Sequence, residues 1–333
     1  NGRGIYVANA TAKGTALNLT PHILNDQELY NSVPQALLSQ IKNNQPLYSI
    51  PDVLEVQALW YNRSILEEAG LLQPGESLPT DWDDFMVLCQ RLVEWSQQTG
   101  RQIMPFALDQ QRYLTIFMAL LASRGGEPYL RQLSQGYLDG GMIQSLELLR
   151  DLSRFSWPDH FPLGINDGRQ AFVDGRSVFF LNGVWDNMVF AGTDLEKDIG
   201  YSPYPGLNGV TVSYVSLSEG YVISSMASQT QQSVCLDFLK YILSEEVQTR
   251  IVEETLQVPL NPAVKVELIR EAHPLLGMAL EEAYKAQVQV PTVYSLWHES
   301  VIESFHANIA SFLEGKISAK EMALLMDKAR ILL

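Results

Sequence analysis

Stretches typical of β-strands alternate with stretches typical of helices along this chain of 333 residues. This alternation limits the possible folds more than any other feature of the sequence. Residues 55–61 (EVQALWY) are rich in β-forming side chains and follow Pro51 and Asp52, so they predict a strand. Residues 177–181 and 220–224 predict two further strands. Strands that alternate with helices predict α/β layers with mainly parallel sheets.

Several predicted helices carry start and stop signals. Thr80 followed by Asp83 has the pattern of a capping box at a helix start, and so does Ser318 followed by Glu321. The glycine pair at 125–126 is expected to end a helix that begins at about residue 113. Apolar residues at helical spacing predict one buried stripe near the carboxyl end, formed by Val301, Phe305, Ile309 and Phe312.

Composition excludes several classes of protein. Hydrophobic residues make up 46% of the chain and charged residues 18%, which suits a globular protein and not a disordered one. Twenty-three basic and 38 acidic residues give a net charge of −15, which argues against a nucleic-acid partner. No apolar run approaches the ~18 residues of a membrane span. The chain has no start of signal-peptide type, so taken alone it would be cytoplasmic, already processed or trimmed.

Motifs for catalysis or for binding metals and nucleotides are not found in the sequence. It has no phosphate loop, dinucleotide fingerprint, nucleophile elbow or HExxH motif, and its five histidines lack metal spacing. Asp83 and Asp84 are better explained by helix capping than as a glycosidase pair. Cys89 and Cys235 are expected to be buried free thiols rather than a disulfide. We therefore expect no catalytic residue, no cofactor and no metal site.

Aromatic residues stand at several predicted element boundaries. Trp185 follows Gly183 just beyond a strand, Trp297 lies near a helix start, and Tyr221 heads the strand predicted at 220–224. Aromatic faces at such edges suit partly apolar ligands such as sugar rings. The alternative is that each is an ordinary aromatic residue of the core or its rim.

Six segments in one order resemble a known family. They are ALWYNRSILEEAGL (58–71), PTDWDDF (79–85), GRQAFVDGRSVFFLNGVW (168–185), SEGYVIS (218–224), FLKYILSEEVQ (238–248) and EGKISAKEM (314–322). Together they resemble the extracellular solute-binding proteins of sugar-importing ABC transporters, family 1, the group that includes maltodextrin-binding protein. The similarity extends from about residue 13 to the carboxyl terminus.

The resemblance implies an α/β fold of the periplasmic-binding-protein type II class, with two lobes and a ligand cleft between them. We expect the chain to cross the hinge near 103–111, 216–221 and 270–276. Lobe I would then comprise residues 1–107 and 219–270, and lobe II residues 108–218 and 271–333. The family opens with a strand, a helix and a strand before the segment at 14–23, so at least one βαβ unit is expected to be absent here.

The resemblance also carries over individual ligand-binding residues. Glu55, seven residues before Asn62, stands where the family has a glutamate that accepts hydrogen bonds from sugar hydroxyls. Trp185 and Trp297 match two stacking tryptophans, and Tyr113 lies about two residues from the position of a ligand-contacting tyrosine. Tyr221 is added from its place at the expected hinge.

The function implied is a non-catalytic receptor. It would bind an oligosaccharide or sugar derivative by aromatic stacking, close about the hinge and deliver the ligand to a membrane permease. We expect a monomer with no nucleic-acid partner, extracytoplasmic, and either free or lipid-anchored. Two alternatives remain at this point, namely a carbohydrate-active enzyme and a sensor or scaffold that no longer serves transport.

Overall fold

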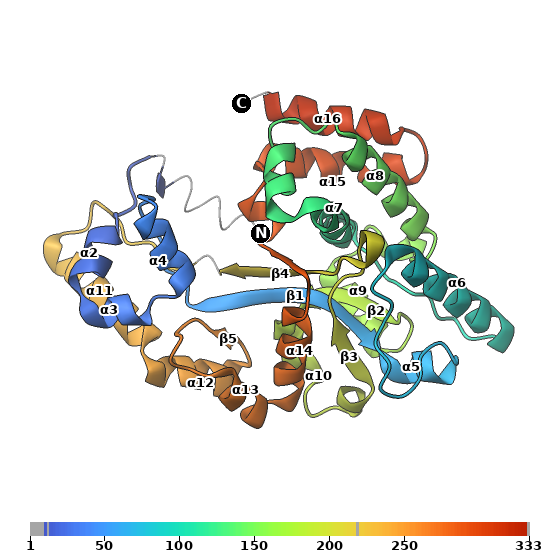
Figure 1. The fold of residues 1–333 in the computed structure, drawn as a ribbon, viewed down its shortest axis with the longest axis horizontal. Helices are drawn as coiled ribbons and strands as arrows, with labels where there is room; N and C mark the ends of the chain where they lie inside the picture. Colours follow the sequence, from blue (N-terminus) through green and yellow to red (C-terminus); the bar gives the residue numbers. More distant parts are fainter. Residues whose placement is uncertain (1–9, 12, 218–219, 332–333) are drawn as a thin grey trace. The chain divides into compact units, whose positions relative to one another are not determined.

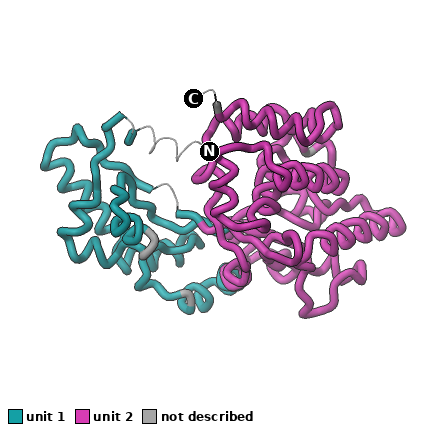
Figure 2. The backbone as a smooth tube through the Cα atoms, turned by 45° about the horizontal axis from the view of Figure 1, so that its top comes forward, with its two compact units in different colours: residues 1–56, 216–278 teal, residues 57–215, 279–333 magenta. Residues whose placement is uncertain are grey.

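The computed structural model describes residues 10–11, 13–217 and 220–331 and divides the chain into two compact units (Figures 1 and 2). Unit 1 comprises residues 1–56 and 216–278, and unit 2 comprises residues 57–215 and 279–333. The chain crosses between the units inside three regular elements. Strand β1 (Val53–Asn62) crosses after Val56, strand β4 (Val212–Leu217) after Val215, and helix α14 (Pro274–Tyr284) after Met278.

Unit 1 is mostly helical. Its other elements are α2 (Thr20–Asn25), α3 (Gln27–Ser32), α4 (Gln35–Lys42), α11 (Gln229–Leu243), α12 (Glu245–Thr255), β5 (Val258–Pro259) and α13 (Val266–Ala272). Its core is formed by aliphatic side chains of these helices, with Leu19, Ile23, Leu239 and Leu243 at most 1% exposed. This unit therefore has a hydrophobic core of its own.

Unit 2 carries the rest of the sheet and the two longest helices, α6 and α7. Its helices are α5 (Arg63–Glu68), α6 (Trp82–Thr99), α7 (Gln110–Leu133), α8 (Gly140–Ser153), α9 (Ile165–Val173), α10 (Asn187–Phe190), α15 (Glu299–Leu313) and α16 (Ala319–Ile331). Its strands are β2 (Phe179–Gly183), β3 (Ile199–Ser202) and β6 (Val288–Val290). Short 3-10 turns are η1 (Pro158–His160), η2 (Val184–Asp186), η3 (Asp194–Lys197), η4 (Leu207–Gly209) and η5 (Val293–Ser295).

The sheet has the strand order β2-β1-β4-β6, and β3 and β5 also pair with β1. Strand β1 is antiparallel to β2, β3 and β5, while β4 and β6 are parallel. The expectation of mainly parallel sheets is therefore wrong for these pairings. The alternation of strands and helices along the sequence did not reveal which strands become neighbours, because pairing depends on contacts distant in sequence.

Helices α7, α8, α15 and α16 pack together in unit 2 (Figure 1). The predicted stripe of α15 is buried as expected, since Val301, Phe305, Ile309 and Phe312 are all inaccessible to solvent. The capping box at the start of α16 is confirmed, because Ser318 Oγ accepts from Glu321 N, and Glu321 Oε2 accepts from Ser318 N.

The structure corrects two local predictions and confirms a third. Helix α6 is capped by Asp81 instead of Thr80, because Asp81 Oδ1 accepts from Asp83 N at 2.9 Å. The prediction that the glycine pair ends a helix is confirmed, because Gly125 and Gly126 have non-helical dihedral angles at the kink that separates two helical segments within α7. Residues 220–224 form no strand, although Tyr221 makes a single bridge to Ile50.

The unit boundaries also differ from the predicted lobes. Residues 57–107 belong to unit 2, whereas they were expected in lobe I. The reason is that β1 runs on beyond residue 56 into pairing with β2 and β3, which holds the following segment in unit 2. The third crossing, after Met278, lies close to the predicted one at 270–276. The second predicted crossing includes residues 218–219, which lie outside the described residues, and the observed crossing follows Val215.

Candidate functional site

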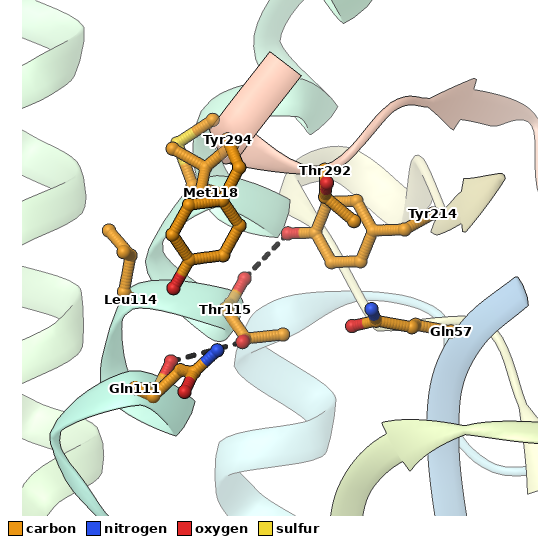
Figure 3. Close-up of a pocket in the computed structure, with 9 residues that line it drawn as sticks. Gln57, Gln111, Leu114, Thr115, Met118, Tyr214, Thr292 and Tyr294 are labelled. Atoms are coloured by element: carbon orange, nitrogen blue, oxygen red, sulfur yellow. Dashed lines mark hydrogen bonds between the residues drawn. The ribbon is translucent and has the colours of Figure 1, made fainter. Parts of the chain in front are cut away.

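A recess in unit 2 is the strongest candidate for a binding site (Figure 3). It encloses about 340 Å³, including the part open to solvent. The residues that line it come from β1, the start of α7, β4 and the segment around η5. They are Gln57, Gln111, Leu114, Thr115, Met118, Tyr214, Thr292, Val293 and Tyr294.

The start of α7 supplies one wall of the recess. Asp109 caps this helix, because its Oδ1 accepts from Arg112 N at 2.9 Å. Gln111, Thr115 and Met118 then follow at spacings of four and three residues, which place them on one face of the helix. The Thr115 hydroxyl donates to Gln111 O at 3.0 Å. The cap thus sets where the helix begins and which side chains face the recess.

Two tyrosines form the opposite part of the lining. Tyr214 is 2% exposed, and its hydroxyl donates to Thr115 O at 2.6 Å (Figure 3). Tyr214 pairs with Val290 in the parallel β4–β6 ladder, and Thr292 lies two residues beyond that partner. Tyr294 is half-buried. Burial raises the pKa of both phenols above the ordinary 10, so both stay protonated at neutral pH.

The chemistry of the lining is polar but uncharged. Two primary amides, two threonine hydroxyls and two phenols provide donors and acceptors, and Leu114, Met118 and Val293 provide apolar contact. None of these nine residues is acidic or basic. Such a surface can form neutral hydrogen bonds to hydroxyl groups and cover the apolar C–H face of a ring. It holds no carboxylate pair for acid–base hydrolysis of a glycosidic bond.

Trp185, a predicted site residue, lies against Gly183, whose partner in strand β1 is Gln57 of the lining. Gly183 pairs directly with Gln57 in the antiparallel β1–β2 ladder, so their side-chain positions share one face of the sheet. The indole of Trp185 covers the position of the missing Gly183 Cβ, since Cζ3 lies 2.2 Å from where that atom would be. The half-buried indole therefore lies beside Gln57, on the face from which Gln57 reaches the recess.

Trp297 and Tyr113 lie in the core of unit 2 instead. Trp297 is 4% exposed, donates from Nε1 to Leu130 O at 3.1 Å, and meets Tyr137 edge-on at 4.9 Å between ring centroids. Tyr113 is 3% exposed and packs against Phe161, and its burial raises its pKa to about 12. Neither ring offers an exposed face for stacking in this unit.

Glu55 and Tyr221 belong to unit 1. Glu55 is half-buried on β1, two residues before Gln57 along the strand. The Tyr221 hydroxyl donates to Asp52 Oδ2 at 3.3 Å, and its ring meets Phe238 edge-on. Both roles in ligand binding stay predictions.

Most residues of the recess were missed from the sequence. Gln57 stands two residues after the predicted Glu55, and Tyr294 three residues before the predicted Trp297. The sequence thus indicated two of the right segments but selected other residues within them. Period-two alternation along β1 could have found Gln57, and an amphipathic start of α7 could have found Gln111 and Thr115. Tyr214 carried no local signal, because its role comes from strand pairing.

Metal-ligand clusters, cysteine pairs and membrane-spanning helices were also sought in the part of the chain that the structure describes. No group of three or more His, Cys, Asp or Glu side chains there could hold a metal ion. Cys89 and Cys235 are free, as expected from the sequence, but only Cys89 is buried, since Cys235 is partly exposed. No helix among those residues has the length and apolar character needed to cross a membrane.

Comparison with known proteins agrees with this structure. A multiple sugar-binding protein of Streptococcus mutans is 24% identical over 307 residues, covering 78% of this chain and 69% of that protein. A solute-binding protein of Streptococcus pneumoniae, solved in complex with the blood group A-trisaccharide, has a TM-score of 0.78 at 22% identity over 97% of this chain and 81% of that one. A chitin oligosaccharide binding protein has a TM-score of 0.80 at 20% identity over 98% and 80%.

The two structural likenesses confirm the predicted α/β fold. The family model of bacterial extracellular solute-binding proteins matches residues 5–273, which is most of the chain. This match confirms the resemblance drawn from the six sequence segments. The chain therefore belongs to the bacterial extracellular solute-binding proteins.

Proposed function

We propose that this protein binds a neutral oligosaccharide and serves as the substrate-binding component of an ABC importer. The observation that carries the proposal is the uncharged, hydrogen-bonding lining of the unit 2 recess. The family and the sugar ligands named for its relatives support the same ligand class.

Each part of the recess has a role in this proposal. Gln57 and Gln111 donate to and accept from ring hydroxyls, and Thr115, Thr292 and Tyr294 add hydroxyl partners. Leu114, Met118 and the ring of Tyr214 contact the apolar faces of the sugar. Trp185, which the family resemblance implies as a stacking residue, would stack on the sugar beside Gln57.

The remaining parts of the function are proposals drawn from the family. The protein would act outside the cytoplasm as a monomer, hand its ligand to a membrane permease, and catalyse no reaction on it. Closure about the hinge upon ligand binding stays a prediction, which small-angle X-ray scattering with and without ligand can measure.

A thermal-shift panel tests the ligand class. Maltotriose, triacetylchitotriose and the blood group A-trisaccharide are offered as neutral sugars, with trigalacturonate as the charged control of similar size. A sugar present at 100 times its dissociation constant adds ~2.7 kcal/mol to the free energy of unfolding, which raises Tm by a few degrees. At least one neutral trisaccharide should do so, and trigalacturonate should not.

Two results would contradict the proposal. One is stabilisation by trigalacturonate alone, since the lining has no cationic side chain to neutralise its carboxylates. The other is release of products from a stabilising sugar during prolonged incubation, which would favour the enzyme alternative. If a Gln111→Ala variant binds the stabilising sugar as tightly as the parent protein, the sugar does not bind in the recess.

A further inference from the structure

The turn that carries Trp185 is held by an unusual set of side-chain hydrogen bonds. Three consecutive carbonyl groups at the end of β2 each accept from a side chain. Arg112 Nε donates to Leu181 O at 3.0 Å, and the Tyr201 hydroxyl donates to Asn182 O at 3.0 Å. Trp60 Nε1 donates to Gly183 O at 3.1 Å. These donors fix the backbone up to the residue beneath the indole.

Buried polar side chains close the turn on its other side. Asn182 Nδ2 donates to Asp186 Oδ2, and Asp186 Oδ1 forms an ion pair with Arg169 at 2.8 Å. Asp186 is 1% exposed, and Arg112 also donates to Asn182 Oδ1, at 3.3 Å. Removing one partner of such a buried network is costly, so the turn has little freedom to shift.

Only the absence of a side chain at Gly183 leaves room for the indole in this turn. A Cβ at Gly183 would lie 2.2–2.4 Å from three carbon atoms of the Trp185 ring, far inside van der Waals contact. The Gly183 backbone has φ −82° and ψ 172°, dihedral angles that any residue adopts. The three atoms nearest to an alanine Cβ at this position would therefore all belong to the indole, and the backbone would not be strained.

We propose that Gly183 is a positioning residue that sets the place of the Trp185 indole beside Gln57, and with it the affinity for sugar. The inference rests on the proposed function. The absence of a Cβ lets the ring lie against the strand at the edge of the recess, while the Asn182–Asp186–Arg169 network keeps the turn from moving away. Gly183 itself contributes no side chain to the ligand.

The first test needs no ligand. The protein is labelled with 5-fluorotryptophan, and the ¹⁹F resonance of Trp185 is assigned by its loss in Trp185→Phe. Gly183→Ala should shift this resonance and leave those of Trp82 and Trp297 in place. An unchanged Trp60 resonance would show that β2 keeps its backbone, because Trp60 donates to Gly183 O. An unmoved Trp185 resonance in Gly183→Ala would overturn the proposal.

The matched control is Gly164→Ala. Gly164 also lies in unit 2 with extended backbone angles (φ −100°, ψ −178°), and a Cβ there would meet nothing within 4 Å. This variant should leave the Trp185 resonance and the sugar affinity unchanged. A shift of Trp185 in Gly164→Ala as large as that in Gly183→Ala would remove the specific link to Gly183.

A double-mutant cycle tests the effect on binding. The probe is whichever of maltotriose, triacetylchitotriose and the blood group A-trisaccharide binds the parent protein most tightly. Gly183→Ala should weaken its binding about tenfold, the order expected for loss of an aromatic contact. In a Trp185→Ala background the same change should alter affinity less than about twofold, because no indole remains to be displaced.

The outcomes separate this proposal from the proposed function. Binding of a neutral trisaccharide by the parent protein supports the function, whatever the variants do. Equal losses from Gly183→Ala in both backgrounds, or no loss from Trp185→Ala, would overturn the positioning role alone. If Gly183→Ala does not fold but the double variant with Trp185→Ala does, the collision between Cβ and indole is supported directly.

Discussion

At the scale of single residues, two tryptophans that looked alike in the sequence have different surroundings. Trp185 is half-buried over Gly183, the strand partner of Gln57, whereas Trp297 is enclosed by the core. The indole N–H of Trp297 has a carbonyl partner in Leu130, and its ring packs against Tyr137. A buried ring with a satisfied donor stabilises the fold and presents no surface to a ligand.

The two tryptophans should therefore respond oppositely to truncation. Trp297→Ala should lower the free energy of unfolding by ~3–5 kcal/mol, because it leaves a cavity and an unpaired carbonyl group. Trp185→Ala should cost far less stability and instead weaken sugar binding. Urea denaturation and calorimetric titration of both variants measure these effects. A Trp297→Ala protein as stable as the parent would place that ring outside the core.

At the scale of elements, two helix starts show when a local sequence pattern predicts the capping residue correctly and when it does not. The box of Ser318 and Glu321 forms as predicted, because both partners lie within one turn. At α6, Asp81 takes the capping position expected for Thr80. Asp81 Oδ2 also accepts from Gly209 N at 3.0 Å, a partner 128 residues away that no local pattern reveals. A tertiary contact thus favours one of two adjacent capping residues.

Substitution at the two positions distinguishes the caps. Asp81→Ala should destabilise the protein by ~1–2 kcal/mol, since it removes the cap of α6 and its link to Gly209. Thr80→Val keeps the shape of the side chain and should stay within ~0.5 kcal/mol of the parent. Thermal unfolding of both variants checks this difference. A larger loss from Thr80→Val than from Asp81→Ala would restore the original assignment.

At the scale of the whole molecule, the net charge of the chain and the uncharged lining of the recess both disfavour anionic ligands. The chain carries a net charge of −15, while the nine residues of the recess carry none. The general field therefore repels anionic ligands, and the recess offers them no compensating cation. A neutral sugar experiences neither effect.

Affinity for a neutral trisaccharide should accordingly depend little on salt or pH. Between about 20 and 500 mM NaCl it should stay within about twofold, whereas any residual binding of trigalacturonate should strengthen as salt screens the repulsion. From about pH 6 to 9 it should also stay constant, because burial raises the pKa of Tyr214 and Tyr294 above their ordinary value and neither loses its proton there. Affinity is measured by calorimetric titration across both ranges. A change of affinity with pH or salt would indicate that an ionising group contacts the sugar.

The sequence by itself determined the elements and the family. Local patterns predicted β1 from its β-forming residues, the start of α6 from a capping box and α15 from its apolar stripe, because each pattern depends on neighbours a few residues apart. The order of six short segments indicated the solute-binding family. Only the tertiary structure decided that β1 pairs antiparallel with β2, that Tyr214 faces the start of α7, and that Trp185 lies over Gly183 while Trp297 is buried in the core. The reason is physical, since these arrangements depend on contacts between residues far apart in the chain, which local patterns do not encode.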